Sequence, residues 1–332
     1  MSAEVLVGSA RLRDEFDSHR PALLAHCYRM TGSYQDAEDV VQETYLRAAR
    51  GVGAFEGRSS LKTWLYRIAT NTCLTELKHR RVLPAGLGAP SSDPDARVFE
   101  GGSHAWLGPL PDAVLGDPGE VVVRRESVRL ALIAALQHLP ARQRAAFLLR
   151  EVLSWSAAEI AETLDISVPA VKSLLQRARQ RLDELDLDAP PPDVAVERAL
   201  LDRYLAAFEA QDTAAIRTVI HDDFSLEAVP HPVWFKGVSV CLPFLERYAF
   251  QADRAIRLRP TRANGQPAAG SYRPDAGGVL RAEGLWVFTV TGERLSRAVK
   301  FPGPELVTAA GLPARLAWPR ESTRAVRPDR SV

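Results

Sequence analysis

The stretch AAEIAETLDISVPAVKSLLQRARQRL, residues 157–182, decides the fold of this part of the chain. A helix-turn-helix needs a small residue where its helices cross, a turn four residues later, and an apolar residue six residues after that. Ala161, Asp165 and Val171 meet this spacing. The turn requires a positive φ, which glycine adopts most easily and aspartate tolerates better than most residues. The stretch therefore predicts a helix-turn-helix.

The second helix of this motif has an apolar face and a polar face. Apolar residues recur every three or four positions on the inward side, as a packed helix requires. The outward side carries groups that can reach phosphates or base edges in the major groove, where lysine and arginine suit guanine and glutamine suits adenine. The residues expected to contact DNA from this helix are Pro169, Lys172, Ser173, Gln176, Arg177 and Arg179.

Upstream, residues 11–81 have the periodicity of consecutive helices. One of these helices carries a row of acidic side chains beside a buried apolar stripe. The segment that follows, from Phe55 to Arg81, is basic instead. Because local fields rather than net charge select partners, the two segments predict two surfaces with different partners.

These segments carry a resemblance to a known family. DAEDVVQETYLRA (36–48), followed by FEGRSSLKTWLYRIATNTCLTELKHRR (55–81), resembles region 2 of extracytoplasmic-function sigma factors, the promoter-recognition subunits of bacterial RNA polymerase. LPARQRAAFLLREVLSWSAAEIAETLDISVPAVKSLLQRARQRL (139–182) resembles their region 4. The resemblance implies two all-α regions that bind core polymerase and promoter DNA, without enzymatic activity.

By that resemblance, the acidic row docks on the basic coiled coil of the polymerase β′ subunit, and opposite surface fields steer the association. The expected polymerase-binding residues are Asp36, Asp39, Gln42 and Glu43.

The basic segment would capture the exposed bases of the −10 element by pockets, stacking and charge, and the helix-turn-helix would read the −35 element. Trp64 also lies on the apolar stripe of its helix, so a core position is the alternative to stacking on a base. The residues expected at the −10 element are Arg58, Trp64, Arg67, Asn71, Lys78 and Arg80.

Composition divides the remaining sequence. Residues 82–123 are rich in proline and glycine and predict a flexible linker, whose apolar patch from Trp106 to Leu115 is expected to dock on a neighbouring domain. Residues 124–187 regain helical patterning. Helix-like and then strand-like runs in residues 194–315 predict an α+β domain, and residues 316–332 predict a disordered tail.

Residues 200–237 resemble the start of SnoaL-like domains, cone-shaped α+β folds of the nuclear-transport-factor-2 class. Sigma factors with this extension form a recognised subgroup, so the resemblance implies a domain that regulates the sigma factor in cis, either activating or inhibiting it. A small ligand or an anti-sigma protein remains a possible partner of the chain. The aromatic residues that either line a ligand pocket or form the core are Trp234, Phe235, Trp286 and Phe288.

Related cones house enzymes that use an aspartate or histidine as acid or base. His221, Asp222 and Asp223 fall at a helix-to-strand junction, where charged residues usually face water, and His231 lies between two prolines in a turn. We therefore expect no catalysis. A pocket enzyme fused to a DNA-binding module remains an alternative, as does a one-component regulator whose helix-turn-helix answers a ligand, although the latter leaves residues 34–81 unexplained.

The composition of the 332 residues, 46% hydrophobic and 25% charged, indicates a globular protein rather than a disordered one. Cys27, Cys73 and Cys241 are far apart and form no CxxC pair, so we expect no metal site, no disulfide framework and no cofactor. No apolar stretch reaches the roughly 20 residues that span a bilayer. The chain is therefore expected in the cytoplasm and not in a membrane.

Overall fold

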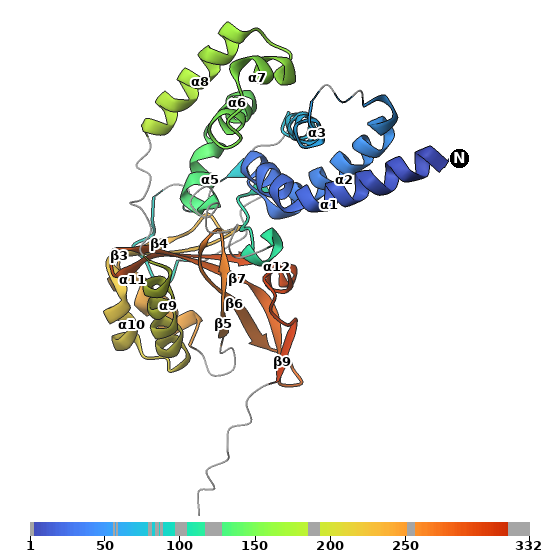
Figure 1. Ribbon diagram of the computed structural model, residues 1–332. Coiled ribbons are helices and arrows are strands. Elements are labelled where there is room, and N and C mark those ends of the chain that lie inside the picture. Colours follow the sequence, from blue (N-terminus) through green and yellow to red (C-terminus); the bar gives the residue numbers. More distant parts are fainter. Residues whose placement is uncertain are drawn as a thin grey trace, which may run out of the picture.

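The computed structural model describes residues 3–55, 57, 59–78, 82–83, 86, 89–96, 105–116, 128–184, 193–250 and 256–317. Figure 1 shows two groups of helices on one side of the molecule and a sheet with its own helices on the other. No helix within those ranges is long and apolar enough to cross a membrane.

The first group of helices lies in the segment that resembles region 2, and it is called region 2 below. It contains α1 (Ala3–Thr31), α2 (Tyr34–Gly51) and α3 (Leu61–Glu76), with a 3-10 turn at Val52–Ala54. The hydroxyl of Ser33 accepts a hydrogen bond from the Asp36 amide, and that of Ser60 accepts one from the Thr63 amide, so both serines cap a helix.

The second group lies in the segment that resembles region 4, called region 4 below, and contains the predicted helix-turn-helix. Its elements are α5 (Leu130–Gln137), α6 (Ala141–Glu151), α7 (Ala157–Leu164) and α8 (Val168–Asp183). Asp165 ends α7 in the left-handed conformation with φ 52°, and the hydroxyl of Ser167 caps α8. The predicted motif is thus present, with aspartate at the turn where glycine would be easiest.

The segment between the two groups contains the two-residue strands β1 (Val82–Leu83) and β2 (Ala105–Trp106), which pair in parallel, and a 3-10 helix at Asp112–Leu115. Leu107, Leu110 and Leu115 are buried in a core that they share with both helical groups. The apolar patch therefore docks as its sequence predicts.

The C-terminal domain has the predicted α+β class. Three helices, α9 (Val194–Glu209), α10 (Thr213–Val219) and α11 (Val238–Tyr248), pack on a mixed sheet of order β4-β3-β8-β7-β6-β5, which matches the cone-shaped fold expected from the sequence. The strands are β3 (Ile220–Ala228), β4 (Phe235–Lys236), β5 (Arg257–Ala263), β6 (Gln266–Pro274), β7 (Val279–Thr291) and β8 (Arg294–Pro302).

Two short elements complete this domain, α12 (Pro304–Ala309) and β9 (Arg315–Ala317). The strand β9 pairs with β7 and takes in two residues of the predicted disordered tail. The prediction is wrong there because Leu316 packs against Tyr272 and Leu280, which the arginine-rich composition does not reveal. Residues 318–332 lie outside the described residues.

The sheet is buried on both faces. Along β7, Trp286 and Phe288 belong to the core beneath α9 to α11, whereas Leu285 and Val287 belong to the core of the sigma-like helices. A strand covered on both sides reads as a continuous apolar run, as in GLWVFTV (284–290). The C-terminal domain is therefore an integral part of the packed molecule.

Candidate nucleic-acid interface

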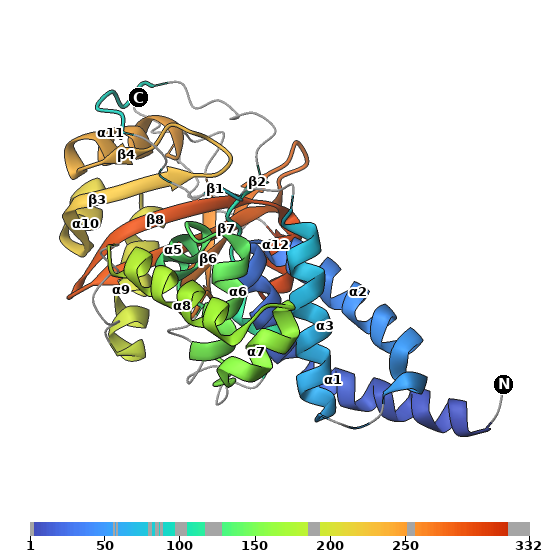
Figure 2. The same ribbon diagram turned by 90° about the horizontal axis from the view of Figure 1, so that it is seen from above.

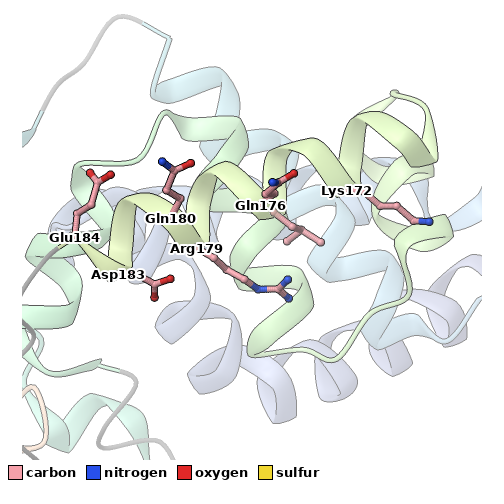
Figure 3. A pocket seen from close by; sticks show the side chains of 7 residues that line it. Lys172, Gln176, Arg179, Gln180, Asp183 and Glu184 are labelled. Carbon is pink, nitrogen blue, oxygen red and sulfur yellow. The ribbon is translucent and has the colours of Figure 1, made fainter.

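The recognition helix α8 turns its predicted DNA-binding side to solvent. Figure 3 shows Lys172, Gln176 and Arg179 along this helix, where they line a shallow groove. Arg177 donates a hydrogen bond to the Ser173 hydroxyl at 3.1 Å. All members of the predicted set are exposed, namely Pro169, Lys172, Ser173, Gln176, Arg177 and Arg179.

Arg179 is partly engaged within region 4. Its guanidinium Nη2 donates to Glu151 Oε1 of α6 at 2.6 Å, and the side chains are 53% and 40% exposed. An exposed ion pair of this kind contributes about 0–1 kcal/mol, so a phosphate or a base edge can replace the glutamate. This side of α8 is thus available to DNA.

The predicted −10 residues on α3 have a different environment. Arg67 donates from Nη1 to Glu162 Oε1 of α7 at 2.6 Å and from Nη2 to the Glu162 carbonyl at 3.4 Å. Figure 2 shows α7 next to α3. Asn71 and Lys78 are exposed, whereas Arg58 and Arg80 lie outside the described residues. Region 4 therefore occupies part of the predicted −10 surface.

Trp64 lies at the edge of this contact. It is half-buried and packs against Phe55 with ring centroids 5.0 Å apart. Both rings line a cleft of about 730 Å³ between region 2 and region 4. The opposite wall of this cleft consists of Trp155, Glu159, Glu162 and Thr163. Trp64 is therefore neither a fully buried core residue nor an open stacking surface in this arrangement.

The predicted polymerase-binding residues lie on α2. Asp36, Asp39 and Glu43 border one hollow of about 350 Å³ between α2 and α3, and Gln42 is exposed. A hydrogen bond from Arg47, with 2.7 Å between Nε and Oε1, holds the pKa of the Glu43 carboxyl below its usual value. The members of the acidic row thus lie together along one side of α2.

Sequence reasoning misses the buried Arg144 of α6. Its Nη1 donates to the carbonyl of Met30 at the end of α1 and to Gln137 Oε1, and its Nη2 donates to the Leu139 carbonyl at 3.1 Å. Burial lowers the pKa of this guanidinium to about 10. Arg144 therefore fastens region 4 to region 2, a role that the sequence alone does not indicate.

A second missed residue is Asn264, at the tip of the β5–β6 hairpin. This fully buried side chain donates from Nδ2 to the Tyr28 hydroxyl and to the Val128 carbonyl, both at 2.7 Å, and its Oδ1 accepts from the Leu110 amide at 2.9 Å. An Asn-Gly pair between two strand-like runs signals a hairpin turn, but not what its tip contacts. One side chain of the C-terminal domain thus touches region 2, the linker and the start of region 4.

The catalytic candidates do not assemble into a site. His221, Asp222 and Asp223 are exposed on β3, whereas His231 lines a separate cavity of the same domain. Among the described residues, no group of three or more histidine, cysteine, aspartate or glutamate side chains is arranged to hold a metal ion.

Comparisons with known proteins agree with this geometry. Residues 16–82 match the family model for Sigma-70 region 2, and residues 129–182 match the model for Sigma-70, region 4. The extracytoplasmic-function (ECF) RNA polymerase sigma factor SigG of Mycobacterium tuberculosis is 45% identical over 317 residues, covering 92% of this chain and 85% of the relative.

Other relatives cover different parts of the chain. The ECF RNA polymerase sigma-E factor of Escherichia coli is 36% identical over 168 residues, which is 50% of this chain and 80% of that protein. The crystal structure of the Mycobacterium tuberculosis sigma factor SigJ has 24% identity and a TM-score of 0.58, covers 90% of this chain and 99% of that one, and shares its fold.

The match to both sigma regions explains residues 34–81, which the alternative of a one-component regulator leaves unexplained. It also disfavours a pocket enzyme, because sigma factors act as non-catalytic subunits of the polymerase. The chain belongs to the extracytoplasmic-function sigma factors, which direct RNA polymerase in transcription initiation.

Proposed function

We propose that the C-terminal domain regulates this sigma factor in cis by holding regions 2 and 4 together. The observation that carries the proposal is the position of Asn264, whose side chain hydrogen-bonds to Tyr28, Leu110 and Val128 at once. The adjacent Gln266 adds a fourth contact, because its Oε1 accepts from the Leu130 amide at the start of α5 at 2.9 Å. We call residues 263–266 the hairpin tip.

In this proposal the surfaces have the roles expected from the family. The acidic row of Asp36, Asp39 and Glu43, with Gln42, docks on the β′ subunit of core polymerase. The −35 element is read by Pro169, Lys172, Ser173, Gln176, Arg177 and Arg179. The −10 element is held by Arg58, Trp64, Arg67, Asn71, Lys78 and Arg80.

The closed arrangement of the two regions is inhibitory in this account. Bases of the −10 element have to reach Trp64 and Arg67, and α7 lies against both through Glu162 and the shared cleft. Region 4 therefore has to move away from region 2 before the −10 surface is complete. The hairpin tip opposes that movement because it contacts both regions.

The test is in-vitro transcription with core polymerase on a genomic promoter library. Asn264→Asp keeps the shape of the side chain and tolerates the left-handed backbone at φ 57°, but it removes the two Nδ2 donations and buries a charge. Tyr28→Phe removes the hydroxyl that accepts from Asn264 and, with it, the hydrogen bond that this hydroxyl donates to the Gly108 carbonyl. A point variant is preferable to truncation after Pro192, which would expose the apolar residues that face β7 and β8.

Both variants are expected to initiate more transcripts than the parent chain, with Asn264→Asp the stronger. Glu293→Ala, at the exposed tip of the β7–β8 hairpin, is the matched control and is expected to behave as the parent does. Folded Asn264→Asp protein with unchanged or reduced initiation would contradict inhibition by the hairpin tip.

A further inference from the structure

The C-terminal domain contains a cavity of about 610 Å³ between its sheet and α11, which is partly open to solvent. Ligand pockets in proteins commonly measure about 300–1,000 Å³ and combine apolar walls with a few polar groups. The walls here are mostly apolar and come from β3, α11 and β7, with Leu226, Phe244, Leu245, Ala249 and Trp286 among their residues.

The polar end of the cavity consists of ion pairs that are already formed. Arg297 donates to Glu227 from Nε at 2.8 Å and from Nη2 at 2.6 Å, and Glu227 is only 4% exposed. Glu283 lies 3.0 Å from Lys300 Nζ and 3.1 Å from Arg273 Nη2. Although burial favours the neutral acid, Lys300 and Arg273 hold the pKa of Glu283 below its usual value.

These ion pairs determine which kind of molecule the cavity can bind. A ligand with a net charge would have to compete with an existing ion pair in a partly desolvated site, which is costly. A neutral molecule leaves the pairs intact and can add hydrogen bonds to their remaining donors and lone pairs. His231, which lines the same cavity, offers a buried Nδ1 atom with no hydrogen-bond partner in the part of the chain that the structure describes.

The linker between regions 2 and 4 forms part of the cavity rim. The Ser91 amide donates to the Trp234 carbonyl at 2.7 Å, Asp95 forms an ion pair with Arg247 of α11, and Ala96 lines the cavity itself. Figure 2 shows this teal segment beside α11. Residues 89–96, called the rim segment here, thus border the cavity from outside the domain.

The rim segment is also connected to region 2. The strands β1 and β2 flank it in sequence and pair with each other, and the Leu107 amide donates to the Leu83 carbonyl at 2.7 Å. The Gly108 amide then donates to the Gly32 carbonyl, which follows α1, at 2.9 Å. The described stretches that precede and follow the rim segment in sequence are therefore bound to each other and to region 2.

We infer that this cavity binds a neutral lipophilic molecule with a hydroxyl or carbonyl group, and that its occupation fastens the rim segment onto the C-terminal domain. The cavity exists with the rim segment in place, so a bound molecule adds contacts to Ala96 instead of displacing it. The regulatory consequence rests on the proposed cis regulation, because a fastened rim segment stabilises the closed arrangement of regions 2 and 4.

The site is tested by titrating the full chain with Nile red, a neutral lipophilic fluorophore, beside the anionic fluorophore 1-anilinonaphthalene-8-sulfonate. Saturable binding of one Nile red per chain is expected, at least about tenfold tighter than binding of the anionic dye. Amide hydrogen exchange of residues 89–96 is expected to slow when Nile red is bound.

Variants locate the bound dye. Ala228→Phe places a ring in the cavity and is expected to weaken Nile red binding at least about tenfold. Ala214→Phe, on the exposed side of α10, is the matched control and is expected to leave binding unchanged. Asp95→Asn removes the rim ion pair and, by the reciprocity of linked equilibria, is expected to weaken binding about two- to fivefold.

Non-saturable Nile red binding, tighter binding of the anionic dye, or an Ala228→Phe variant that binds as the parent does would overturn the site. Binding without slower exchange of residues 89–96 would overturn the role of the rim segment. Neither result affects the transcription test of Asn264→Asp. Conversely, if Asn264→Asp does not raise transcription but Nile red still binds, the ligand site stands and its regulatory role is overturned.

Discussion

The two candidate DNA-binding helices differ in what surrounds them. Helix α8 presents its predicted side chains to solvent, and Arg179 pairs only with Glu151 of its own region among the contacts described. Helix α3 instead has Arg67 bound to Glu162 of the other region and Trp64 at the edge of a shared cleft. In the proposed account, this difference leaves −35 recognition available in the closed arrangement, whereas −10 recognition requires regions 2 and 4 to separate.

The contacts that hold the closed arrangement also differ in strength. The Arg67–Glu162 pair is largely exposed, with side chains 42% and 69% accessible, so it contributes little. Arg144 and Asn264 are buried, and loss of either leaves buried polar groups without partners. Beside the apolar core that both regions share, these two buried residues therefore contribute more to the closed arrangement than the exposed ion pair does.

The largest effect is expected from Arg144→Met. The carbonyls of Met30 and Leu139 lose a donor, at about 1–3 kcal/mol for each buried group left unpaired. Denaturant unfolding measures the loss. Arg142→Met, on the exposed side of the same helix, is the control, and an equal loss in both variants would mean that the region 2–region 4 contact is not specific.

Much of this fold follows from the sequence, because the decisive signals are local. The spacing of Ala161, Asp165 and Val171 is enough to predict the helix-turn-helix, and strand-like runs after Pro192 are enough to predict an α+β domain. The acidic row can be predicted in the same way, because its members recur at helical spacing along one helix.

The contacts between domains could not be predicted. Asn264 meets Tyr28 across 236 positions, and Arg67 meets Glu162 across 95, so no periodicity relates the partners. The rim segment likewise reads as linker because its contacts come from Trp234 and Arg247 of another domain. Both faces of the sheet are buried, so the apolar run in β7 is continuous. Its residues therefore do not indicate which core each face of the strand contacts.

Gln176→Ala tests the open helix α8. Loss of a bidentate contact to a base is expected to weaken −35 binding by about 1–3 kcal/mol, and by the same amount in the Asn264→Asp background, because α8 is exposed in either case. Fluorescence anisotropy with a promoter duplex measures it. Gln180→Ala, one turn further along, is the control. If Gln176→Ala weakens −35 binding only in the Asn264→Asp background, α8 is inaccessible to DNA in the parent chain.

Acid is expected to loosen region 2 before region 4. His26 of α1 is fully buried beside Thr70, and burial together with nearby Arg29 lowers its pKa to about 3, whereas His138 in region 4 is exposed. The unfolded chain takes up this proton near pH 6.5, so stability is lost as pH falls from about 6.5 toward 3, by about 1.4 kcal/mol per pH unit.

Hydrogen exchange at pH 7.0 and pH 5.5 measures this loss in each region separately. His26→Gln keeps a hydrogen-bonding side chain without the titration and is expected to flatten the pH dependence of region 2. Equal acid sensitivity of the two regions in the parent chain would contradict the assignment of this effect to His26. An unchanged pH dependence of region 2 in His26→Gln would contradict it as well.

The smallest effect is expected from Glu162→Gln, which weakens the ion pair with Arg67 but preserves the shape of α7. Binding of single-stranded −10 DNA is expected to rise by about 0.2–1 kcal/mol, the range for an exposed ion pair. A gain in binding free energy above about 2 kcal/mol would show that this ion pair, and not Asn264, controls access to the −10 surface. Glu159→Gln, which faces the same cleft, provides the comparison.

The most direct measurement is the distance between spin labels on α3 and α7, attached at Lys62→Cys and Ala158→Cys, which are exposed positions; the native cysteines are buried. The account predicts one narrow, short distribution for the free protein and a shift to longer distances in Asn264→Asp and in the complex with core polymerase and promoter DNA. An identical narrow distribution in Asn264→Asp would contradict the claim that the C-terminal domain holds regions 2 and 4 together.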